Sequence, residues 1–278
     1  MIGRILVLGA TGTIGAPLVA ALVAGGQQVR AASRQAASMP GAEPVHFDYA
    51  DPSTIAPAFE GVDRVFVLVP AGTLDIVGLV RPVLQEAARR KVKVVLLSVL
   101  GADADDNIPY RQLELSLERG AVPFVILRPN WFADNFHTFW RAGVSRGVIA
   151  VPAADGKSSF IDARDIAASA AAALASDRFD GKAFNLTGPQ ALSYAEAAAI
   201  LSRALGREIV YTAVDDRTFI DGLVAAGLAP DYAAFLASIF HPVREGWTAG
   251  VTGDVQALTG RLPRPLEVYA ADHVGLWG

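Results

Sequence analysis

The feature that most constrains the fold is a glycine loop near the N-terminus, GATGTIG at residues 9–15. It follows a short apolar run and precedes a segment, residues 14–24, whose apolar residues recur at helical spacing. Three glycines at this spacing permit a tight turn, close approach of the backbone to a pyrophosphate, and close packing of helix on strand. We therefore predict a nucleotide site, the alternative being a turn that binds nothing. The predicted contacts are Gly9, Thr11, Gly12, Thr13, Ile14 and Gly15.

Strand-like and helix-like segments alternate through the first half of the chain. The expected strands are residues 4–9, 28–33, 45–48, 64–69, 92–98 and 124–127, and the expected helices are residues 14–24, 76–90 and 109–119. This order predicts an α/β fold, a Rossmann-like doubly wound parallel sheet. Ligands of such sheets bind beyond the carboxyl ends of the strands. The cofactor contacts expected there are Ser33, Arg34, Asp48, Val69, Pro70, Ser98 and Pro129.

The pattern loosens after Pro129. Residues 142–156 and 242–253 are rich in Gly, Pro and polar residues, so we expect loops there. Ser193 and Glu196 have the spacing of a capping box, and short helices are expected near residues 218–226, 232–240 and 266–273. We expect one unit over 1–278, with a nucleotide-binding core over about 1–130. The rest, about 131–278, would add further sheet and helix elements and a smaller, mostly helical substrate lobe.

Composition excludes several classes of protein. Hydrophobic residues make up 52% of the 278 and charged residues 19%, which excludes disorder. There is no cysteine, and four scattered histidines make a metal centre unexpected. The net charge of −4 comes with no basic block, so no nucleic-acid partner is expected. No apolar run approaches the ~20 residues of a membrane span. We expect a soluble, cytoplasmic protein that binds a small molecule, whether as a monomer or a homodimer.

The second expected strand favours one cofactor. NAD sites usually place an acid about 20 residues beyond the loop to bind the ribose 2′-hydroxyl. Between Gly15 and Glu43 the charged residues are Arg30 and Arg34, and Arg34 falls at the strand end. A guanidinium there can bind a 2′-phosphate through two hydrogen bonds, unless it is only a solvated charge. We predict NADP(H) rather than NAD(H). Asp48 would bind the adenine amino group or simply cap the next turn.

Several segments together resemble a known family. They are the glycine loop, the Ser33-Arg34 and Phe47-Asp48 strand ends, residues 126–132 (ILRPNWF), 160–167 (FIDARDIA) and 185–189 (NLTGP). The chain resembles, over nearly its whole length, the atypical short-chain dehydrogenases of the NmrA-like type. That resemblance implies NADPH-dependent reductases of quinones, of triphenylmethane dyes or of the iminium groups of ergot alkaloids. It also implies nucleotide-sensing regulators without turnover, so the fold alone does not settle catalysis.

The catalytic positions depart from those of ordinary short-chain dehydrogenases. Such enzymes use a Ser, a Tyr and a Lys four residues after the Tyr, whose cation lowers the phenol pKa for proton exchange. Here Ser98 and Tyr110 are the predicted catalytic residues, but Glu114 stands where the Lys would be. An anion one helical turn away disfavours the phenolate. Reduction of a carbonyl with a proton from the protein is therefore not expected.

Some hydride acceptors need no proton from the enzyme. An iminium or a triarylmethyl cation becomes neutral on receiving hydride, and quinones and azo groups can take their protons from water. Such acceptors require mainly position and orientation. Glu114 would stabilise a cationic acceptor, or it would be a solvated or Arg-paired helix residue.

An aromatic cluster follows the expected strand end at Arg128. Flat rings stack on aromatic side chains, so part of this cluster is a predicted acceptor site. The predicted substrate contacts are Tyr110, Trp131, Phe132, Asn135 and Phe136. Phe139 and Trp140 are expected to pack the second lobe instead.

Two functions follow from these observations. The first is an NADPH-dependent reductase that delivers hydride to a flat, electron-poor molecule such as an iminium, quinone or dye cation. The second is a regulator that senses NADP(H) without turnover. The aromatic cluster favours the reductase, since a sensor would not need it.

Overall fold

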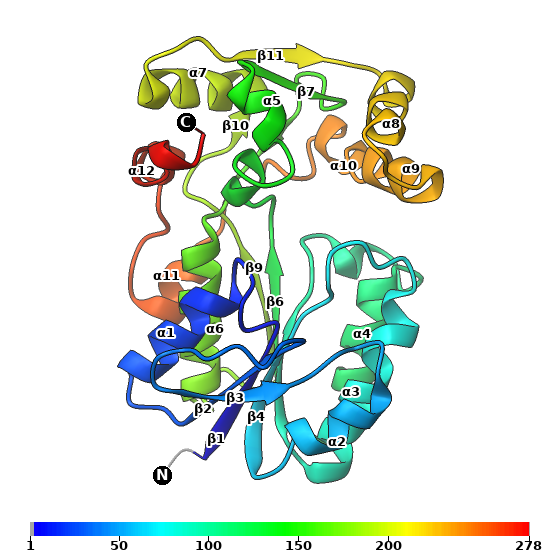
Figure 1. The fold of residues 1–278 in the computed structure, drawn as a ribbon, viewed down its shortest axis with the longest axis vertical. Helices are drawn as coiled ribbons and strands as arrows, with labels where there is room; N and C mark the ends of the chain where they lie inside the picture. Colours follow the sequence, from blue (N-terminus) through cyan, green and yellow to red (C-terminus); the bar gives the residue numbers. More distant parts are fainter. Residues whose placement is uncertain (1–2, 278) are drawn as a thin grey trace. The chain divides into compact units, whose positions relative to one another are not determined.

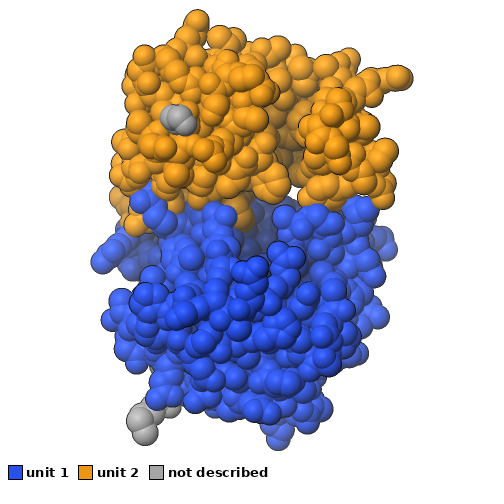
Figure 2. Space-filling view, in the orientation of Figure 1, with its two compact units in different colours: residues 1–129, 163–186, 254–261 blue, residues 130–162, 187–253, 262–278 orange. Residues whose placement is uncertain are grey.

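A computed structural model describes residues 3–277 of the chain. The chain forms two compact units, which Figure 2 draws in different colours. Unit 1 comprises Met1–Pro129, Ala163–Leu186 and Asp254–Arg261. Unit 2 comprises Asn130–Asp162, Thr187–Gly253 and Leu262–Gly278. The chain therefore returns twice to unit 1 after first leaving it at residue 129.

Unit 1 is built on a seven-stranded sheet in the order β3-β2-β1-β4-β5-β6-β9, and every pair in it is parallel. The strands are β1 Arg4–Leu8, β2 Val29–Ser33, β3 Ala42–His46, β4 Val62–Val67, β5 Lys93–Leu97, β6 Phe124–Pro129 and β9 Lys182–Leu186. The order reverses between β1 and β4, and the ends of these two strands are the position at which such sheets generally bind ligands.

Helices cover both faces of this sheet, as Figure 1 shows. On one face α1 packs against α6, and α6 against α11; on the other, α3 packs against α2 and α4. Their bounds are α1 Gly15–Ala24, α2 Ile55–Ala58, α3 Ile76–Arg90, α4 Pro109–Glu118, α6 Ala163–Ala175 and α11 Asp254–Thr259, with short 3-10 turns η1 Pro52–Thr54 and η2 Ala102–Ala104. The predicted doubly wound parallel sheet is confirmed.

Burial explains why the central strands read as continuous apolar runs. All five residues of β5 are buried, because helices cover the sheet on both sides. Lys93 is the polar exception, and its ammonium contacts the Asp180 carboxylate at 2.5 Å and donates to the Ser176 carbonyl at 2.6 Å. The outer strand β3 tolerates Pro44 because an edge strand needs partners on one side only.

Unit 2 contains two small sheets and several short helices. Strand β7 (Val148–Val151) pairs in parallel with β11 (Val210–Ala213), and β8 (Lys157–Ser158) pairs antiparallel with β10 (Leu192–Ser193). The helices are α5 Arg141–Ser145, α7 Tyr194–Leu205, α8 Asp216–Ala225, α9 Pro230–Ser238, α10 His241–Arg244 and α12 Leu266–Asp272, with 3-10 turns η3 Ala133–Phe136 and η4 Val274–Leu276.

The second half of the chain holds both a confirmed prediction and two wrong ones. The Ser193 hydroxyl accepts from the Glu196 N–H at 3.1 Å while the Glu196 carboxylate accepts from the Ser193 N–H at 2.7 Å, so the capping box at α7 is confirmed. Residues 142–156, predicted as a loop, contain most of α5 and all of β7. Residues 242–253 likewise contain most of α10. Strand β7 pairs with β11, whose residues lie 62 positions later in the chain, and local composition does not reveal such a pairing.

Within residues 3–277, no helix combines the length and the apolar character that crossing a membrane requires.

Candidate active site

The candidate site lies at the carboxyl ends of the strands of unit 1. The strand order reverses between β1 and β4, and the loops that follow these strands carry the glycine motif and Val69-Pro70. The predicted residues at the neighbouring strand ends are Ser33 and Arg34 after β2, Asp48 after β3, Ser98 after β5 and Pro129 in β6. One edge of one sheet therefore collects all of the predicted cofactor residues.

The glycine loop has the geometry that its spacing predicts. Gly9 has a φ of +66°, which favours glycine, and its carbonyl accepts from the Gly12 N–H at 2.9 Å. A Cβ on Gly15 would lie 2.1 Å from the Gly9 oxygen and 2.8 Å from the Ala10 Cα. Because both neighbours are backbone, only glycine lets α1 begin this close to β1.

The start of α1 is built to receive an anion. Ile14 occupies the N-cap position and gives no side-chain hydrogen bond, and the first turn contains no acidic residue. Thr11, Gly12 and Thr13 are exposed just before it. A helix N-terminus without a capping side chain presents unpaired N–H groups and a positive dipole end. These residues fit the pyrophosphate of a dinucleotide.

Of the two arginines in the β2 region, only Arg34 is available to a ligand. Arg30 is 8% exposed, donates to the carbonyls of Pro57, Ala58 and Glu60, and pairs with Glu43 at 3.2 Å. The Arg34 side chain is exposed and makes no hydrogen bond or ion pair with any residue of 3–277. The Ser33 hydroxyl accepts from the Ala37 N–H at 3.0 Å, so its own hydrogen can still be donated.

Tyr49 joins two of the predicted cofactor segments, and the sequence analysis did not single it out. Its hydroxyl donates to the Leu68 carbonyl at 2.6 Å, immediately before Val69-Pro70. Its ring meets Phe47 edge-on, with centroids 4.8 Å apart. Burial raises the pKa of Tyr49 above its usual value, so the phenol stays a neutral donor. The adjacent Asp48 is half-buried and caps the next turn by accepting from the Ala50 N–H at 2.9 Å.

Glu114 lies at the centre of a buried polar cluster. The side chain is completely buried, and the Ser98 hydroxyl donates to its Oε1 at 2.6 Å. Arg128 approaches with two parallel bonds, Nε to Oε1 at 2.8 Å and Nη2 to Oε2 at 2.7 Å. Such a bidentate pair is strong and fixed in direction. Glu114 is therefore Arg-paired, one of the alternatives expected for it, and it is not solvated.

Further ion pairs of Arg111 and Arg128 extend this cluster. Arg111 donates to Glu114 Oε2 at 3.1 Å and to Glu118 at 2.7 Å, and Arg128 Nη1 contacts Asp103 at 2.5 Å. Burial alone would raise the pKa of Glu114, but the hydrogen bonds from Arg128 and Ser98 hold that pKa below its usual value. Glu114 is thus an ionised carboxylate whose charge is already balanced, which leaves it unsuited to stabilise a cationic acceptor.

The cluster changes what Ser98 can do. The sequence predicts Ser98 as a catalytic and cofactor-binding residue, but the residue is 2% exposed and its hydroxyl proton is directed at Glu114. The physical reason for a role in proton donation is therefore removed, and we leave Ser98 out of the proposed reacting groups. Tyr110, at the start of α4, is half-buried and packs against the hydrophobic core of unit 1.

The aromatic cluster of unit 2 divides differently from the prediction. Phe136, predicted to contact substrate, is fully buried with its ring 5.2 Å from Phe160 and 5.1 Å from Trp140, so it is a core residue. Phe139, predicted to pack, is 64% exposed. Nearness to the strand end did not reveal this, because residues 133–136 form a 3-10 turn whose side-chain directions the sequence did not predict.

The other predicted substrate contacts keep exposed surface. Trp131, Phe132 and Asn135 are each half-buried. The Trp131 ring stacks on Trp140 with centroids 5.8 Å apart and contacts Phe240 at 4.7 Å, which fixes its orientation. A half-buried ring held from behind can offer its other face to a flat molecule.

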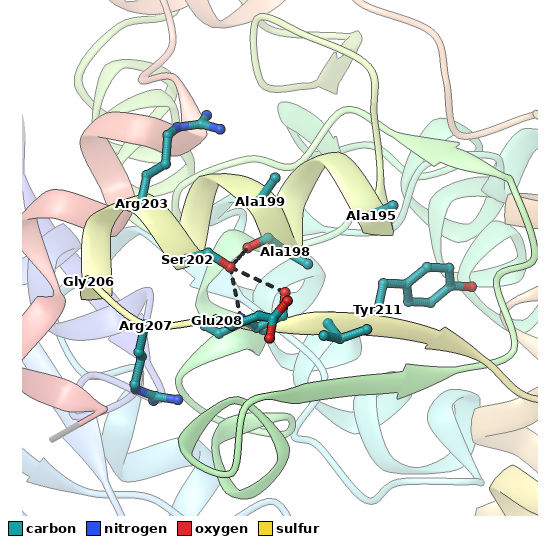
Figure 3. Close-up of a pocket in the computed structure, with 11 residues that line it drawn as sticks. Ala195, Ala198, Ala199, Ser202, Arg203, Gly206, Arg207, Glu208 and Tyr211 are labelled. Carbon is teal, nitrogen blue, oxygen red and sulfur yellow. Dashed lines mark hydrogen bonds between the residues drawn. The ribbon is translucent and has the colours of Figure 1, made fainter.

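A shallow depression of about 770 Å³ lies between α7 and β11 in unit 2 (Figure 3). Its walls are residues of α7, of the segment 206–209 that follows it and of the start of β11, and Arg203 and Arg207 point to opposite sides of it. Among the described residues, none of those predicted for cofactor or substrate lines this depression. Within residues 3–277 no group of three or more His, Asp or Glu side chains is placed to hold a metal ion.

Comparison with known proteins agrees with this geometry. A family model described as the NmrA-like family matches residues 1–241. The uncharacterized oxidoreductase YesF of Bacillus subtilis is 34% identical over 98% of this chain and 96% of its own length. The NAD(P)H azoreductase of Xenophilus azovorans is 31% identical over 99% of both chains.

A solved structure shows the same likeness in three dimensions. The triphenylmethane reductase of Citrobacter sp., complexed with NADP(H), has a TM-score of 0.81 and 25% identity. The match covers 98% of this chain and 99% of the reductase.

Proposed function

The chain belongs to the NmrA-like family, and we propose that it reduces flat, electron-poor small molecules by hydride transfer from NADPH. It is an NAD(P)H-dependent oxidoreductase with NADP(H) as its cofactor. The proposed acceptors are iminium ions, quinones and dye cations. The observation that carries this choice is the buried Ser98–Glu114–Arg128 cluster, in which each polar group is satisfied by the others.

The residues at the strand ends of unit 1 would hold the cofactor. The backbone of residues 9–15 and the N-terminus of α1 fit the pyrophosphate, and Ser33 and Arg34 fit the 2′-phosphate. We assign Asp48, Val69, Pro70 and Pro129 to the remaining contacts. Bound there, NADPH supplies a hydride.

At Ser98, Tyr110 and Glu114 the groups differ from the proton relay that carbonyl reduction uses. A phenol donates efficiently when a neighbouring cation lowers its pKa. The residue four positions after Tyr110 is instead an ionised Glu114, locked by Arg128. The Ser98 hydroxyl, a second donor in such relays, gives its proton to the same carboxylate. The protein therefore acts by orienting the reactants and not by moving a proton.

The proposed acceptors suit such a site. An iminium or triarylmethyl cation gains a hydrogen and an electron pair at one carbon and becomes neutral, so no proton is consumed. A quinone or azo group takes a hydride and then one proton, which water can supply. Holding two reactants in the right geometry can account for many orders of magnitude in rate.

We further propose that Trp131, Phe132 and Asn135 contact the acceptor and that Tyr110 helps to orient it. Support comes from their half-buried state and from the packing that fixes the Trp131 ring. Phe136 is omitted because its side chain is fully buried.

The test is NADPH oxidation followed by absorbance with a triarylmethane dye, a cyclic iminium ion, a para-quinone and a simple cyclic ketone. We expect turnover of the cations and the quinone, with the ketone inert. Reduction of the ketone as efficiently as the iminium of the same ring would contradict the proposal. Tight NADPH binding with no turnover of any acceptor would favour a nucleotide sensor instead.

A further inference from the structure

Trp247 is a large aromatic side chain of unit 2 that the protein leaves in water. It is 64% exposed, whereas the other tryptophans of the described chain are buried or half-buried. Its ring meets that of His241 at 81°, with centroids 5.5 Å apart. A near-perpendicular contact covers at most one face of an indole. The other face is therefore open to a flat ligand.

The backbone that leads into Trp247 is fixed by the end of α10. Gly246 has a φ of +76°, and its N–H donates to the Val243 carbonyl at 3.0 Å. The Trp247 N–H donates to the Pro242 carbonyl at 2.9 Å. These two bonds form a Schellman motif, in which a left-handed residue ends a helix and sets the direction of the chain after it. The exposed ring is therefore carried by a hydrogen-bonded turn.

The backbone that follows Trp247 is bound to the residue before Trp131. Thr248 is 7% exposed, and its carbonyl accepts from the Asn130 side-chain amide at 2.7 Å. The same amide donates to the Ser159 hydroxyl at 2.6 Å, and the Asn130 side-chain oxygen accepts from the Trp131 N–H at 2.8 Å. One buried amide thus joins the residue after Trp247 to the backbone of Trp131.

A second link between the two tryptophans passes through the start of α10. The Phe240 ring contacts Trp131 with centroids 4.7 Å apart, and the next residue, His241, contacts Trp247. Phe240 is fully packed in the hydrophobic core of unit 2, which fixes this link from the inside. Two separate links therefore hold the exposed ring of Trp247 close to a residue that we assign to the acceptor.

We propose that Trp247 is a specificity residue, whose open face binds a second ring of the acceptor and favours multi-ring cations over single-ring molecules. This role rests on the proposed function, since it takes Trp131 as an acceptor contact. An indole face attracts cations and stacks on flat rings. A triarylmethyl cation has both properties, and it carries rings beyond the carbon that receives hydride. A single-ring quinone held at Trp131 has no second ring to reach Trp247.

The test compares wild type with Trp247→Ala on a cationic triarylmethane dye and on a single-ring para-quinone, with NADPH as the hydride donor. We expect the KM for the dye to rise about tenfold, as for the loss of one aromatic and cationic contact. The kcat for the dye, and both constants for the quinone, should stay within about twofold of wild type. This split is expected because Trp247 binds a ring away from the reacting carbon, in the ground state and the transition state alike.

Two further variants serve as controls. Trp247→Phe keeps a smaller aromatic face and should restore most of the affinity for the dye. Phe139→Ala is the matched control, because Phe139 is also 64% exposed in unit 2 but takes no part in either link to Trp131. It should leave the constants for both acceptors unchanged.

The outcomes separate this role from the proposed function. An unchanged KM for the dye in Trp247→Ala, or an equal loss for dye and quinone, would overturn the role of Trp247 and leave the proposed reductase standing. Reduction of the quinone but not of the dye by wild type would do the same.

Sedimentation of both proteins gives a further check. Weaker self-association of Trp247→Ala, with an unchanged KM for the dye, would assign the ring to a contact between two copies of the chain and overturn the role in specificity. If wild type reduces neither acceptor, the proposed function fails and the role of Trp247 fails with it.

Discussion

Two polar regions at the same edge of the sheet of unit 1 are built in opposite ways. In the glycine loop and at the end of β2, the helix start has no capping side chain, and the side chain of Arg34 has no partner within residues 3–277. In the Ser98–Glu114–Arg128 cluster, every polar side chain points at another and Glu114 is fully buried. The first region keeps its hydrogen-bonding groups for a ligand, whereas the second uses its groups within the protein.

This difference separates binding from proton chemistry. Unpaired donors at a surface cost little in water and gain strength when an anion arrives. A buried carboxylate must be paired in the folded protein, and once paired it is unavailable to substrate. We propose that the region in which ordinary short-chain dehydrogenases place their proton relay is structural here, and that the nucleotide region binds the cofactor.

The largest expected effect comes from breaking the buried cluster. Glu114→Leu should lower the free energy of unfolding by about 3–5 kcal/mol, because Arg128 is left as an uncompensated buried charge. Urea unfolding measures this loss. Glu118→Ala, which removes an exposed partner of Arg111, is the matched control and should cost less than about 1 kcal/mol. A loss for Glu114→Leu as small as that of the control would show that the cluster is not buried as described.

The same cluster predicts how stability depends on pH. Because the pKa of Glu114 is lower in the folded protein than in the unfolded chain, its stabilising contribution is complete above the ordinary glutamate pKa. It is lost as the pH falls through the lowered folded value. Wild type should therefore lose more stability than Glu114→Leu between pH 5 and pH 3. Parallel loss in the two proteins would contradict the role of Glu114.

The next largest effect, a loss of NADPH binding, is expected for Gly15→Ala in the glycine loop. The new Cβ would lie 2.1 Å from the Gly9 oxygen, so the backbone of the loop must move. We expect NADPH binding, measured by fluorescence, to weaken about a hundredfold, since close backbone approach to the pyrophosphate is lost. Gly222→Ala, in the middle of α8 where a Cβ meets nothing within 4 Å, is the control and should leave binding unchanged. Normal binding by Gly15→Ala would refute the assigned role of the loop.

A smaller and more selective effect is expected at Arg34. Arg34→Ala should weaken NADPH about tenfold or more, the loss of a charge-assisted contact, while NADH changes little. Fluorescence titration with both nucleotides measures the ratio. Equal losses for NADPH and NADH would remove the 2′-phosphate from this strand end.

The smallest expected effect lies in unit 2, where neither region contributes. Burial, then the charges of His273 and Arg141, lower the pKa of His137. The unfolded chain therefore binds the proton more readily, and stability falls as the pH drops below the ordinary histidine value of ~6.5. Thermal unfolding at pH 7.5 and 5.5 should show a small drop for wild type that His137→Phe reduces. An unchanged drop would assign the pH dependence elsewhere.

Sequence reasoning reached the two polar regions unequally, for a physical reason. The glycine loop is local, because Gly9, Gly12 and Gly15 act on one another within seven residues, so its geometry follows from spacing. The buried cluster joins Ser98, Glu114 and Arg128 from three elements, and the spacing of residues does not give the phase at which α4 turns Glu114 inward. The sequence shows that Glu114 replaces the expected lysine, but it does not show that the Glu114 side chain is buried.

Long-range packing also explains other differences between the structure and the expectations from the sequence. Strand β7 forms by pairing with β11, and the Tyr49 hydroxyl donates to the Leu68 carbonyl at the end of another strand. Phe136 is buried and Phe139 is exposed, the reverse of what was expected, and a 3-10 turn at residues 133–136 carries Phe136. Each of these depends on a partner distant in the sequence or on a turn that periodicity does not encode.

The central claim is that the protein orients its reactants and supplies no proton. It is tested most directly with Tyr110→Phe on a quinone that wild type reduces. Reduction of a quinone by hydride also consumes one proton, which either water or the Tyr110 phenol would supply. The account predicts a kcat/KM within about threefold of wild type, because water supplies the proton and the phenol only helps to orient the acceptor. A fall of about a hundredfold or more, the usual contribution of a general acid, would contradict it.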